Sequence, residues 1–258
     1  MNGAHRGEPV ALWLSGLSYY FGAVGAVRDV DLSVAEGARH GIIGPNGAGK
    51  TTLFNLLTGE LRPTSGSITL FGTDVTHTPQ PRRVALGLGR TYQITRTFGA
   101  LTVLENLTLA TLGLSPHKFA LFRRWTGYRG NREMLEQVAE RFQLSHRLQR
   151  RAADLSHGEQ RQLDVALAVT LRPRVLLLDE PGAGLSPGER LTMTRLIQEL
   201  PADLTVVMIE HDMDMVRDVV SRVTVLHLGR VVADGPTSRI RQDERVRALY
   251  LGRRVTDA

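Results

Sequence analysis

The chain has no cysteine among its 258 residues, and only 5% of its residues are aromatic. The missing cysteines exclude disulfide cross-links and thiol catalysis, and they are compatible with a reducing compartment such as the cytosol. No apolar run approaches the roughly 20 residues that a membrane-spanning helix needs. The N-terminal segment carries Glu8 and lacks a long apolar core, so we expect no signal peptide. What remains, with 42% hydrophobic residues, is typical of a globular protein of one or two domains.

Lysine is also scarce. Of 32 basic residues only Lys50 and Lys118 are lysines, so the formal net charge of +6 comes from arginine. Because the arginines are spread along the chain, they favour a solvated basic surface. Residues 117–129 form one denser cluster of basic and aromatic side chains. That composition suits single-stranded nucleic acid, a membrane surface or a protein partner, and it is equally typical of an irregular surface insertion.

Apolar runs alternate with helical patterns along most of the chain. Alternation and buried runs predict strands at residues 10–17, 30–34, 39–43, 67–71, 174–179 and 204–209, with a hairpin at 223–228 and 230–233. Helical spacing predicts helices at 188–200, 212–221 and 237–250, and a helical pattern begins at Val103 and continues to about Ser145. Strands that alternate with helices predict an α/β fold with a parallel sheet, into which the helical block is inserted.

The segment 44–51 fits the phosphate-binding pattern G-x-x-x-x-G-K-[ST] at every position. It lies between an apolar strand and a helix, so its glycines direct backbone N–H groups toward one point at the positive end of the helix dipole. Lys50 is then expected to reach the β- and γ-phosphates, and the Thr51 hydroxyl to bind Mg²⁺.

Two further segments carry candidate chemistry. The strand at 174–179 ends in Asp179 and Glu180, which should point to different sites because side chains alternate along a strand. Beside a phosphate loop, Asp179 is expected to hold Mg²⁺ and Glu180 to accept a proton from the attacking water. Ser156 and Glu159 form the S-x-x-E pattern of a capping box, and this predicted helix N-terminus is a candidate second phosphate-binding end.

Five segments in this order resemble the ATP-binding cassette (ABC) ATPase family. They are the phosphate loop, Gln93 at the Q-loop position, residues 155–160 at the position of the family's L-S-G-G-Q signature, the Asp179-Glu180 strand end, and His211 after the strand at 204–209. The resemblance extends from about residue 10 to 251. It implies an α/β P-loop NTPase fold in a single domain over 1–258, with a mainly parallel sheet, an antiparallel β subdomain and an inserted α-helical subdomain at about 95–170.

The resemblance also implies roles for individual residues. Glu180, His211 and Gln93 would be catalytic, and Thr51, Gln93 and Asp179 would hold Mg²⁺. Phe21 aligns with the aromatic residue that stacks on adenine, with Tyr20 as the adjacent alternative. The remaining contacts to ATP are expected from the phosphate loop and the signature segment: Gly44, Pro45, Asn46, Gly47, Ala48, Gly49, Lys50, Thr51, Thr52, Ser156, Gly158 and Glu159.

Three positions depart from the family pattern. His157 replaces a glycine of the signature, and Glu159 replaces its glutamine. Ser186 stands where the family usually has an aspartate that helps communication across the dimer. These departures bear on crosstalk between two sites more than on nucleotide binding.

Other stretches are similar to one branch of the family, the ATPase subunits of importers for branched-chain amino acids and urea-type amides. They are residues 89–93, an enlarged helical insertion near 113–130, residues 183–187 and 209–213, and the ending 246–252, the last of which also occurs in ATPases for lipopolysaccharide export. The resemblance implies transmembrane permeases, a second ATPase subunit and indirectly a solute-binding protein as partners, no nucleic acid, and a peripheral place on the cytoplasmic face of the inner membrane. The alternatives are an ABC ATPase of lipid export, a non-transport ABC ATPase acting on ribosomes or DNA, and a simple P-loop kinase or regulatory module.

Overall fold

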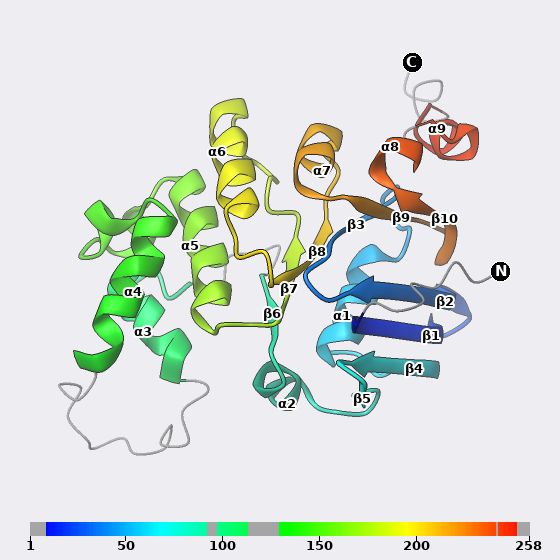
Figure 1. The fold of residues 1–258 in the computed structure, drawn as a ribbon, viewed down its shortest axis with the longest axis horizontal. Helices are drawn as coiled ribbons and strands as arrows, with labels where there is room; N and C mark the ends of the chain where they lie inside the picture. Colours follow the sequence, from blue (N-terminus) through cyan, green and yellow to red (C-terminus); the bar gives the residue numbers. More distant parts are fainter. Residues whose placement is uncertain (1–8, 92–96, 113–128, 241, 252–258) are drawn as a thin grey trace.

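A computed structural model of the chain describes residues 9–91, 97–112, 129–240 and 242–251 (Figure 1). Gln93 and the basic, aromatic cluster at 117–129 lie outside these residues, except for Arg129 at the start of a helix. The described residues form two β-sheets and a set of helices, with the helical end on the left of Figure 1 and the antiparallel sheet on the right.

The larger sheet contains the strands that lead into the phosphate loop and into the Asp179-Glu180 pair. Its six strands lie in the order β10 (Arg230–Pro236), β9 (Arg222–His227), β3 (Arg39–Ile43), β8 (Thr205–Ile209), β7 (Val175–Asp179) and β6 (Leu88–Arg90). Neighbouring strands run parallel from β9 to β6, and β10 pairs antiparallel with β9. The parallel sheet and the hairpin expected at 223–233 are therefore confirmed.

The central strands are buried on both faces, which explains their continuous apolar runs. In β7, Leu177 packs into the core shared with the antiparallel sheet, whereas Leu176 and Leu178 pack against the helical side. The same alternation holds in β8 for Val207 and Met208. Each strand thus joins two hydrophobic cores, and its carboxyl end is held rigidly between them.

The smaller sheet is antiparallel, with β2 (Val24–Ala35), β1 (Val10–Phe21), β4 (Ser65–Leu70) and β5 (Thr73–Asp74) in that order. Strands β1 and β2 are longer than predicted, because they continue to pair up to the turn at Gly22 despite shifts in register that interrupt the alternation. Helix α1 (Lys50–Thr58) buries Leu53, Phe54 and Leu57 in a core made by residues of both sheets. The helix that begins at the phosphate loop therefore has its position fixed from both sides.

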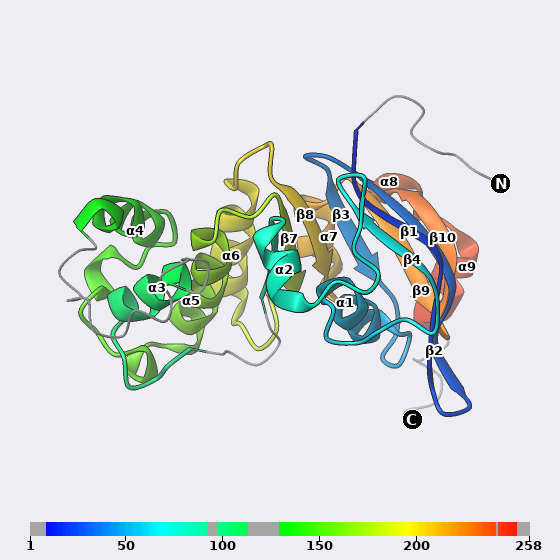
Figure 2. The ribbon, with the colours of Figure 1, turned by 90° about the horizontal axis from the view of Figure 1, so that it is seen from below.

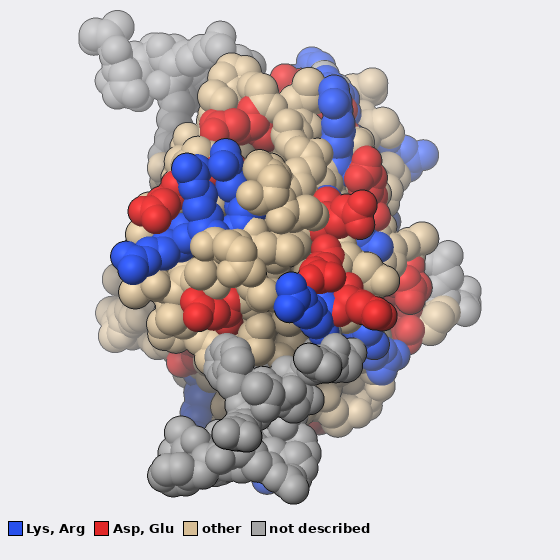
Figure 3. Space-filling view, turned by 90° about the vertical axis from the view of Figure 1, so that its left-hand side faces the viewer, with Lys and Arg blue, Asp and Glu red and all other residues tan. Residues whose placement is uncertain are grey.

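The helical end consists of α3 (Val103–Leu112), α4 (Arg129–Arg141) and α5 (His157–Thr170), with short 3-10 turns η2 (Ser145–Arg147) and η3 (Ala152–Asp154) between them. These helices share one hydrophobic core, to which Val103, Leu135, Phe142 and Leu163 contribute. Both ribbon views place them at one end of the molecule (Figures 1 and 2). On that face the basic and acidic side chains are interspersed rather than separated, as expected for a solvated surface (Figure 3).

The remaining helices are α2 (Gln80–Ala85), α6 (Pro187–Gln198), α7 (Met213–Val219), α8 (Thr237–Ile240) and α9 (Glu244–Leu251). Helices α6 and α7 confirm the predictions at 188–200 and 212–221. The single helix expected at 237–250 is wrong, since α8 ends at Ile240 and α9 begins at Glu244. The Asp243 carboxylate accepts a hydrogen bond from the Arg245 amide at 2.9 Å, which is the contact by which an aspartate starts a new helix.

Candidate nucleotide site

The phosphate loop connects β3 to α1 in a conformation that needs glycine. Gly44 and Gly49 have φ of 152° and 101°, and a side chain at either position would collide with the carbonyl of Leu226 or of Ala26. The Lys50 ammonium lies over the loop and donates to the Gly44 carbonyl at 2.7 Å and the Pro45 carbonyl at 3.1 Å. The loop therefore closes around its own lysine in the way that a phosphate cradle requires.

The helix that follows offers a row of backbone donors. The first helical hydrogen bond of α1 runs from the Leu53 amide to the Gly49 carbonyl at 2.9 Å, so the amides of Lys50, Thr51 and Thr52 belong to the first turn, whose N–H groups have no acceptor inside the helix. Thr51 is exposed there and Thr52 is half-buried. Together with the helix dipole, this turn favours an anion at the loop.

Asp179 at the end of β7 lies close to this loop and is almost fully buried. Its Oδ2 accepts from Arg90 Nη2 at 2.8 Å, while its buried Oδ1 has no hydrogen-bond partner among the described residues. Burial raises the pKa of the Asp179 carboxyl above its ordinary value, against the opposing effects of Arg90 and Lys50. An oxygen that is buried and unpaired beside the Lys50 charge fits a cation ligand.

Arg90 is a residue of this site that sequence reasoning missed. Besides binding Asp179, its guanidinium donates to the Asn55 side chain at 2.7 Å and lies 5.7 Å from the centre of the Phe54 ring. It therefore links β6 and β7 to α1, directly behind the phosphate loop. The sequence offered no signal beyond a basic residue after an apolar segment, because no local pattern predicts which distant carboxylate an arginine will meet.

Glu180 and His211 meet at the neighbouring strand ends. Glu180 Oε1 lies 2.5 Å from His211 Nε2. Glu180 follows the last residue of β7 and has φ of 50°, so the chain turns there. The two adjacent carboxylates thus contact different partners, as predicted, with Asp179 facing Arg90 and Glu180 facing His211.

The predicted capping box at the start of α5 is confirmed. Ser156 is the N-cap residue, its hydroxyl accepts from the Glu159 amide at 3.2 Å, and its own amide donates to Glu159 Oε2 at 2.9 Å. Arg147 donates to the other oxygen of Glu159 at 2.7 Å. The Glu159 carboxylate is therefore engaged within its own chain, where it stabilises the helix start.

Two of the three departures from the family pattern lie close together. A side chain on Gly184 would come within 2.8 Å of His157 Nε2, and one on Gly158 within 2.5 Å of Glu189 Oε1. Ser186 is the N-cap of α6 and forms a second capping box with Glu189. Hydrogen bonds from Ser186, with a smaller contribution from the Gly158 amide, lower the pKa of Glu189. The starts of α5 and α6 are thus packed against each other.

The remaining predicted residues are Phe21, Tyr20 and Gln93. Phe21 and Tyr20 are exposed at the end of β1. Their turn adjoins the phosphate loop, because β2 brings the Ala26 carbonyl against Gly49. Gln93 lies outside the described residues. The structure therefore groups the loop, Asp179, Glu180 and His211 in one place, while α5 lies well apart from α1 in both ribbon views (Figures 1 and 2).

The phosphate loop, the buried carboxylate and the glutamate–histidine pair together resemble a nucleotide hydrolase, and comparison with known proteins identifies its family. The ABC transporter profile matches residues 27–183. The chain belongs to the ABC transporter ATPases. As a member of this family it is an ATP-binding subunit and an ATP hydrolase.

Curated relatives of this ABC ATPase cover nearly its whole length. It is 40% identical over 248 residues to the high-affinity branched-chain amino acid transport ATP-binding protein BraF of Pseudomonas aeruginosa, which covers 93% of this chain and 97% of that protein. It is 38% identical, with the same coverage, to LivG of Escherichia coli, which carries the same description. The lipopolysaccharide export system ATP-binding protein LptB of Acidithiobacillus ferridurans is 36% identical over 229 residues, or 88% of this chain and 90% of that protein.

A solved structure confirms the fold. The ADP conformation of MJ1267, an ATP-binding cassette of an ABC transporter, superposes on this ABC ATPase with a TM-score of 0.84 at 30% identity and covers 94% of this chain and 99% of that chain. Among the helices in the described ranges, none has the length and hydrophobicity that crossing a bilayer requires. The names of BraF and LivG describe them as ATP-binding proteins of transport systems.

Proposed function

We propose that this ABC ATPase energises the uptake of branched-chain amino acids or of a related small polar solute. The observation that carries the proposal is the similarity over almost the full length to BraF and LivG, whose names specify branched-chain amino acid transport. The specific alternative is lipopolysaccharide export, which the similarity to LptB favours with lower identity over a shorter segment. In either case the expected place of the protein is the cytoplasmic face of the inner membrane, bound to permeases.

ATP is proposed to bind with its phosphates at residues 44–52 and its adenine near Phe21. The glycine cradle and the first-turn amides of α1 support the first contact, and the exposure of Phe21 beside the loop supports the second. Lys50 would exchange its two carbonyl acceptors for the β- and γ-phosphates. Charged phosphate oxygens make shorter and stronger hydrogen bonds than neutral carbonyls, which favours this exchange.

Magnesium is proposed to be held by Thr51, Asp179 and Gln93. The unpaired Oδ1 of Asp179 and the exposed Thr51 fit such a site, while the described residues contain no cluster of three His, Asp or Glu side chains that could hold a metal alone. The donor set therefore becomes complete only with phosphate oxygens. When bound, the ion offsets the negative charge of the phosphates.

Hydrolysis is proposed to depend on Glu180 as general base and His211 as its partner. With the proton on Nε2, His211 donates to Glu180 Oε1, which keeps the carboxylate oriented. His211 would also contact the γ-phosphate, and Gln93 would contact the attacking water. Glu180 and the 210–212 segment follow the ends of the adjacent parallel strands β7 and β8, so the sheet brings the two loops that carry the carboxylate and the imidazole side by side.

The complete site is proposed to need a second ATPase subunit, which is a copy of this chain or a related chain. Within one chain the start of α5, with Ser156, Gly158 and Glu159, lies apart from the phosphate loop (Figures 1 and 2). Two chains packed head to tail would bring the signature segment of one to the nucleotide of the other. The exposed position of Ser156 at the start of α5 supports this contact.

Permeases are proposed to dock at a groove between the nucleotide core and the helical end, which we treat as an inserted subdomain at about 95–170. The groove has a volume of about 250 Å³, and exposed Phe98 and buried Asn106 line it together with Leu109, Leu167 and Leu171. Arg90, the partner of Asp179, lies at the same groove. Movement of a docked permease would thus reach the nucleotide site through Arg90, which precedes Gln93 by three positions in the sequence.

Co-expression with permeases tests two of these proposals, the transported solute and the docking groove. The chain is expected to co-purify with the permeases of a branched-chain amino acid system, and to support uptake of labelled leucine into cells that also supply the solute-binding protein. Phe98→Asp should abolish co-purification, whereas the matched control Leu228→Asp, at an exposed site on the turn between β9 and β10, should not. Retention of the complex by Phe98→Asp would exclude the groove. If the chain assembles only with lipopolysaccharide-export permeases, the proposed amino acid uptake is wrong and lipopolysaccharide export is the better proposal.

A further inference from the structure

The loop after Glu180 and the loop that carries His211 are joined by a second, buried glutamate. Glu210 directly follows β8 and is only 3% exposed. Its Oε1 accepts from the Gly182 amide at 2.7 Å, and its Oε2 accepts from the amides of His211 at 2.6 Å and Asp212 at 3.1 Å. One carboxylate thus binds the backbone of both loops that carry the proposed catalytic pair.

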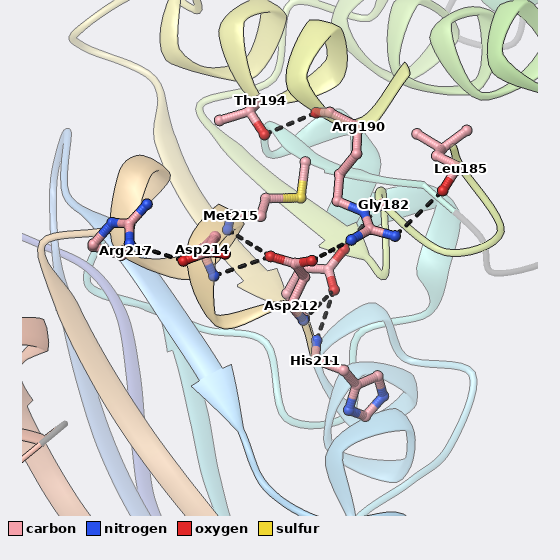
Figure 4. A network of polar contacts seen from close by, with 10 residues as sticks. Gly182, Leu185, Arg190, Thr194, His211, Asp212, Asp214, Met215 and Arg217 are labelled. Carbon is pink, nitrogen blue, oxygen red and sulfur yellow. Dashed lines mark hydrogen bonds and ion pairs between the residues drawn. The ribbon is translucent and has the colours of Figure 1, made fainter. Parts of the chain in front are cut away.

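The next acidic residue makes a parallel connection. Arg190 of α6 donates to Asp212 Oδ2 at 2.5 Å and to the Leu185 carbonyl at 3.2 Å. Figure 4 shows the Arg190 side chain between Leu185 and Asp212, with the His211 ring directed away from them. The segment 210–212 is therefore tied to the segment 182–185 at two points, and His211 between them is left to face Glu180.

A carboxylate at position 210 can accept hydrogen bonds with both of its oxygens, whereas an amide of the same size cannot. Each of its two oxygens accepts from a different loop, and burying a carboxylate is tolerated only when such hydrogen bonds satisfy it. A glutamine has a single acceptor oxygen, and its NH₂ group would face an amide N–H. Packing alone therefore does not explain a glutamate at this position.

The backbone conformation at Glu180 needs a stabilising contact from outside its own loop, such as the one that Glu210 provides. Glu180 has φ of 50°, a backbone conformation that a glutamate adopts at a cost. The amide of Glu180 donates to the Ile209 carbonyl at 3.0 Å, and two residues further on the chain is held by Glu210. We propose that Glu210 is a positioning residue, which fixes the Glu180 carboxylate and the His211 imidazole at the separation that hydrolysis requires. The inference rests on the proposed catalytic roles of Glu180 and His211.

The first experiment replaces Glu210 by glutamine in the purified full chain. Glu210→Gln is expected to lower kcat for ATP at least ~10-fold and to leave the dissociation constant for ATP within ~2-fold, because misplacement of catalytic groups affects the chemical step more than binding. The ¹⁵N signals of the His211 imidazole should also shift, which a merely structural role would not cause. Glu199→Gln, an exposed glutamate at the end of α6, is the matched control and should change none of these.

A second variant disturbs the same contact without touching the charge. The Cβ of Gly182→Ala would lie 2.7 Å from Glu210 Oε1, so the carboxylate must move. We expect the same selective loss of kcat, and no further loss in the double variant with Glu210→Gln, because both changes break one connection. If Glu210→Gln does not fold, Gly182→Ala decides the question alone.

The outcomes separate this inference from the proposed function. A kcat within ~2-fold of the Glu199→Gln control in either folded variant overturns the positioning role, since a misplaced catalytic pair must slow the chemical step. A parallel loss of ATP affinity and kcat overturns it too, because the contact would then serve the nucleotide site as a whole. If Glu180→Gln hydrolyses ATP normally, the proposed catalytic pair itself is wrong.

Discussion

The two halves of the proposed ATP site differ in how their polar groups are satisfied. At the phosphate loop, Lys50 donates to carbonyls that phosphate oxygens can replace, and Asp179 Oδ1 has no partner in the part of the chain that is described. At the start of α5, Ser156, Glu159 and Arg147 satisfy one another. The first half therefore has groups that a bound ligand can satisfy. The second is a self-contained surface, which we propose contributes only when presented to a nucleotide bound by another chain.

Removing the lysine of the first half should have the largest effect. Lys50→Ala takes away the side-chain cation that donates to the loop carbonyls, and we expect ATP affinity to fall at least ~100-fold, the loss typical of strong charge-assisted hydrogen bonds. Titration with a fluorescent ATP analogue measures it. Arg195→Ala removes one exposed positive charge from α6 and is the control. Equal affinities of the two variants would contradict the role of Lys50.

The proposed catalytic pair, Glu180 and His211, gives the next largest effect. A variant of this pair separates ATP binding from hydrolysis within the first half. Glu180→Gln keeps the size of the side chain but removes the base, so kcat should fall by roughly 10²–10⁴-fold while ATP still binds. The protein should then accumulate as an ATP-bound dimer in size-exclusion chromatography with light scattering. Hydrolysis at the wild-type rate would contradict the assignment, and an inactive variant that stays monomeric with ATP would contradict the shared site.

Mixing two inactive variants tests whether the halves come from different chains. Lys50→Ala destroys the first half, and Ser156→Arg blocks the second at an exposed position. If each site is shared, half of the randomly paired dimers carry one intact site, so the mixture should recover up to about a quarter of wild-type turnover. Recovery is measured as ATPase activity against the mixing ratio. If one chain supplied both halves, the mixture would stay as inactive as its components.

In both halves the sequence predicts the local features and misses the contacts between distant segments. The loop, the strand ends and both cores follow from local patterns, because glycine positions, buried strands and the S-x-x-E box are read within a few residues. Arg90, Glu210 and Arg190 were not predicted, since each acts through a partner on another element that is distant in sequence. The break between α8 and α9 was missed for a local reason, namely the competing cap at Asp243.

The proximity of His157 to Gly184 is another feature that local sequence patterns do not predict, here at the start of α5. Both departures were visible in the sequence as single substitutions, His157 in the signature and Ser186 after the proposed catalytic glutamate. Only the fold shows that the loop with Gly184 and Ser186 lies against the start of α5. A histidine in the signature is thus accompanied by a glycine opposite it, at φ of 73°, where a side chain would be strained and would meet the ring.

The smallest expected effect concerns the stability cost of burying the ionised Asp179 carboxylate, which is the proposed cation ligand of the first half. Burial raises the pKa of Asp179, so its ionised form is less stable in the folded protein than in the unfolded chain. That penalty is absent at low pH, where the carboxyl is protonated, and develops as the pH rises through the raised pKa. Asp179→Asn, which keeps the shape and an acceptor for Arg90, should therefore melt about 1–3 °C higher than the wild type at neutral pH without nucleotide, with the gap closing in acid.

Calorimetry across the pH range, at one salt concentration and without nucleotide, measures this difference. Glu199→Gln, an amide substitution at an exposed site, shows how much of any change is due to net charge alone. ATP together with Mg²⁺ should raise the melting temperature of the wild type more than ATP alone does. The Asp179→Asn protein should lose this difference, because the unpaired oxygen has been replaced by an amide donor or a weaker ligand. A lower melting temperature at neutral pH would mean that the Arg90 contact outweighs the burial of Asp179, and that this half of the site, like the other, is satisfied within its own chain.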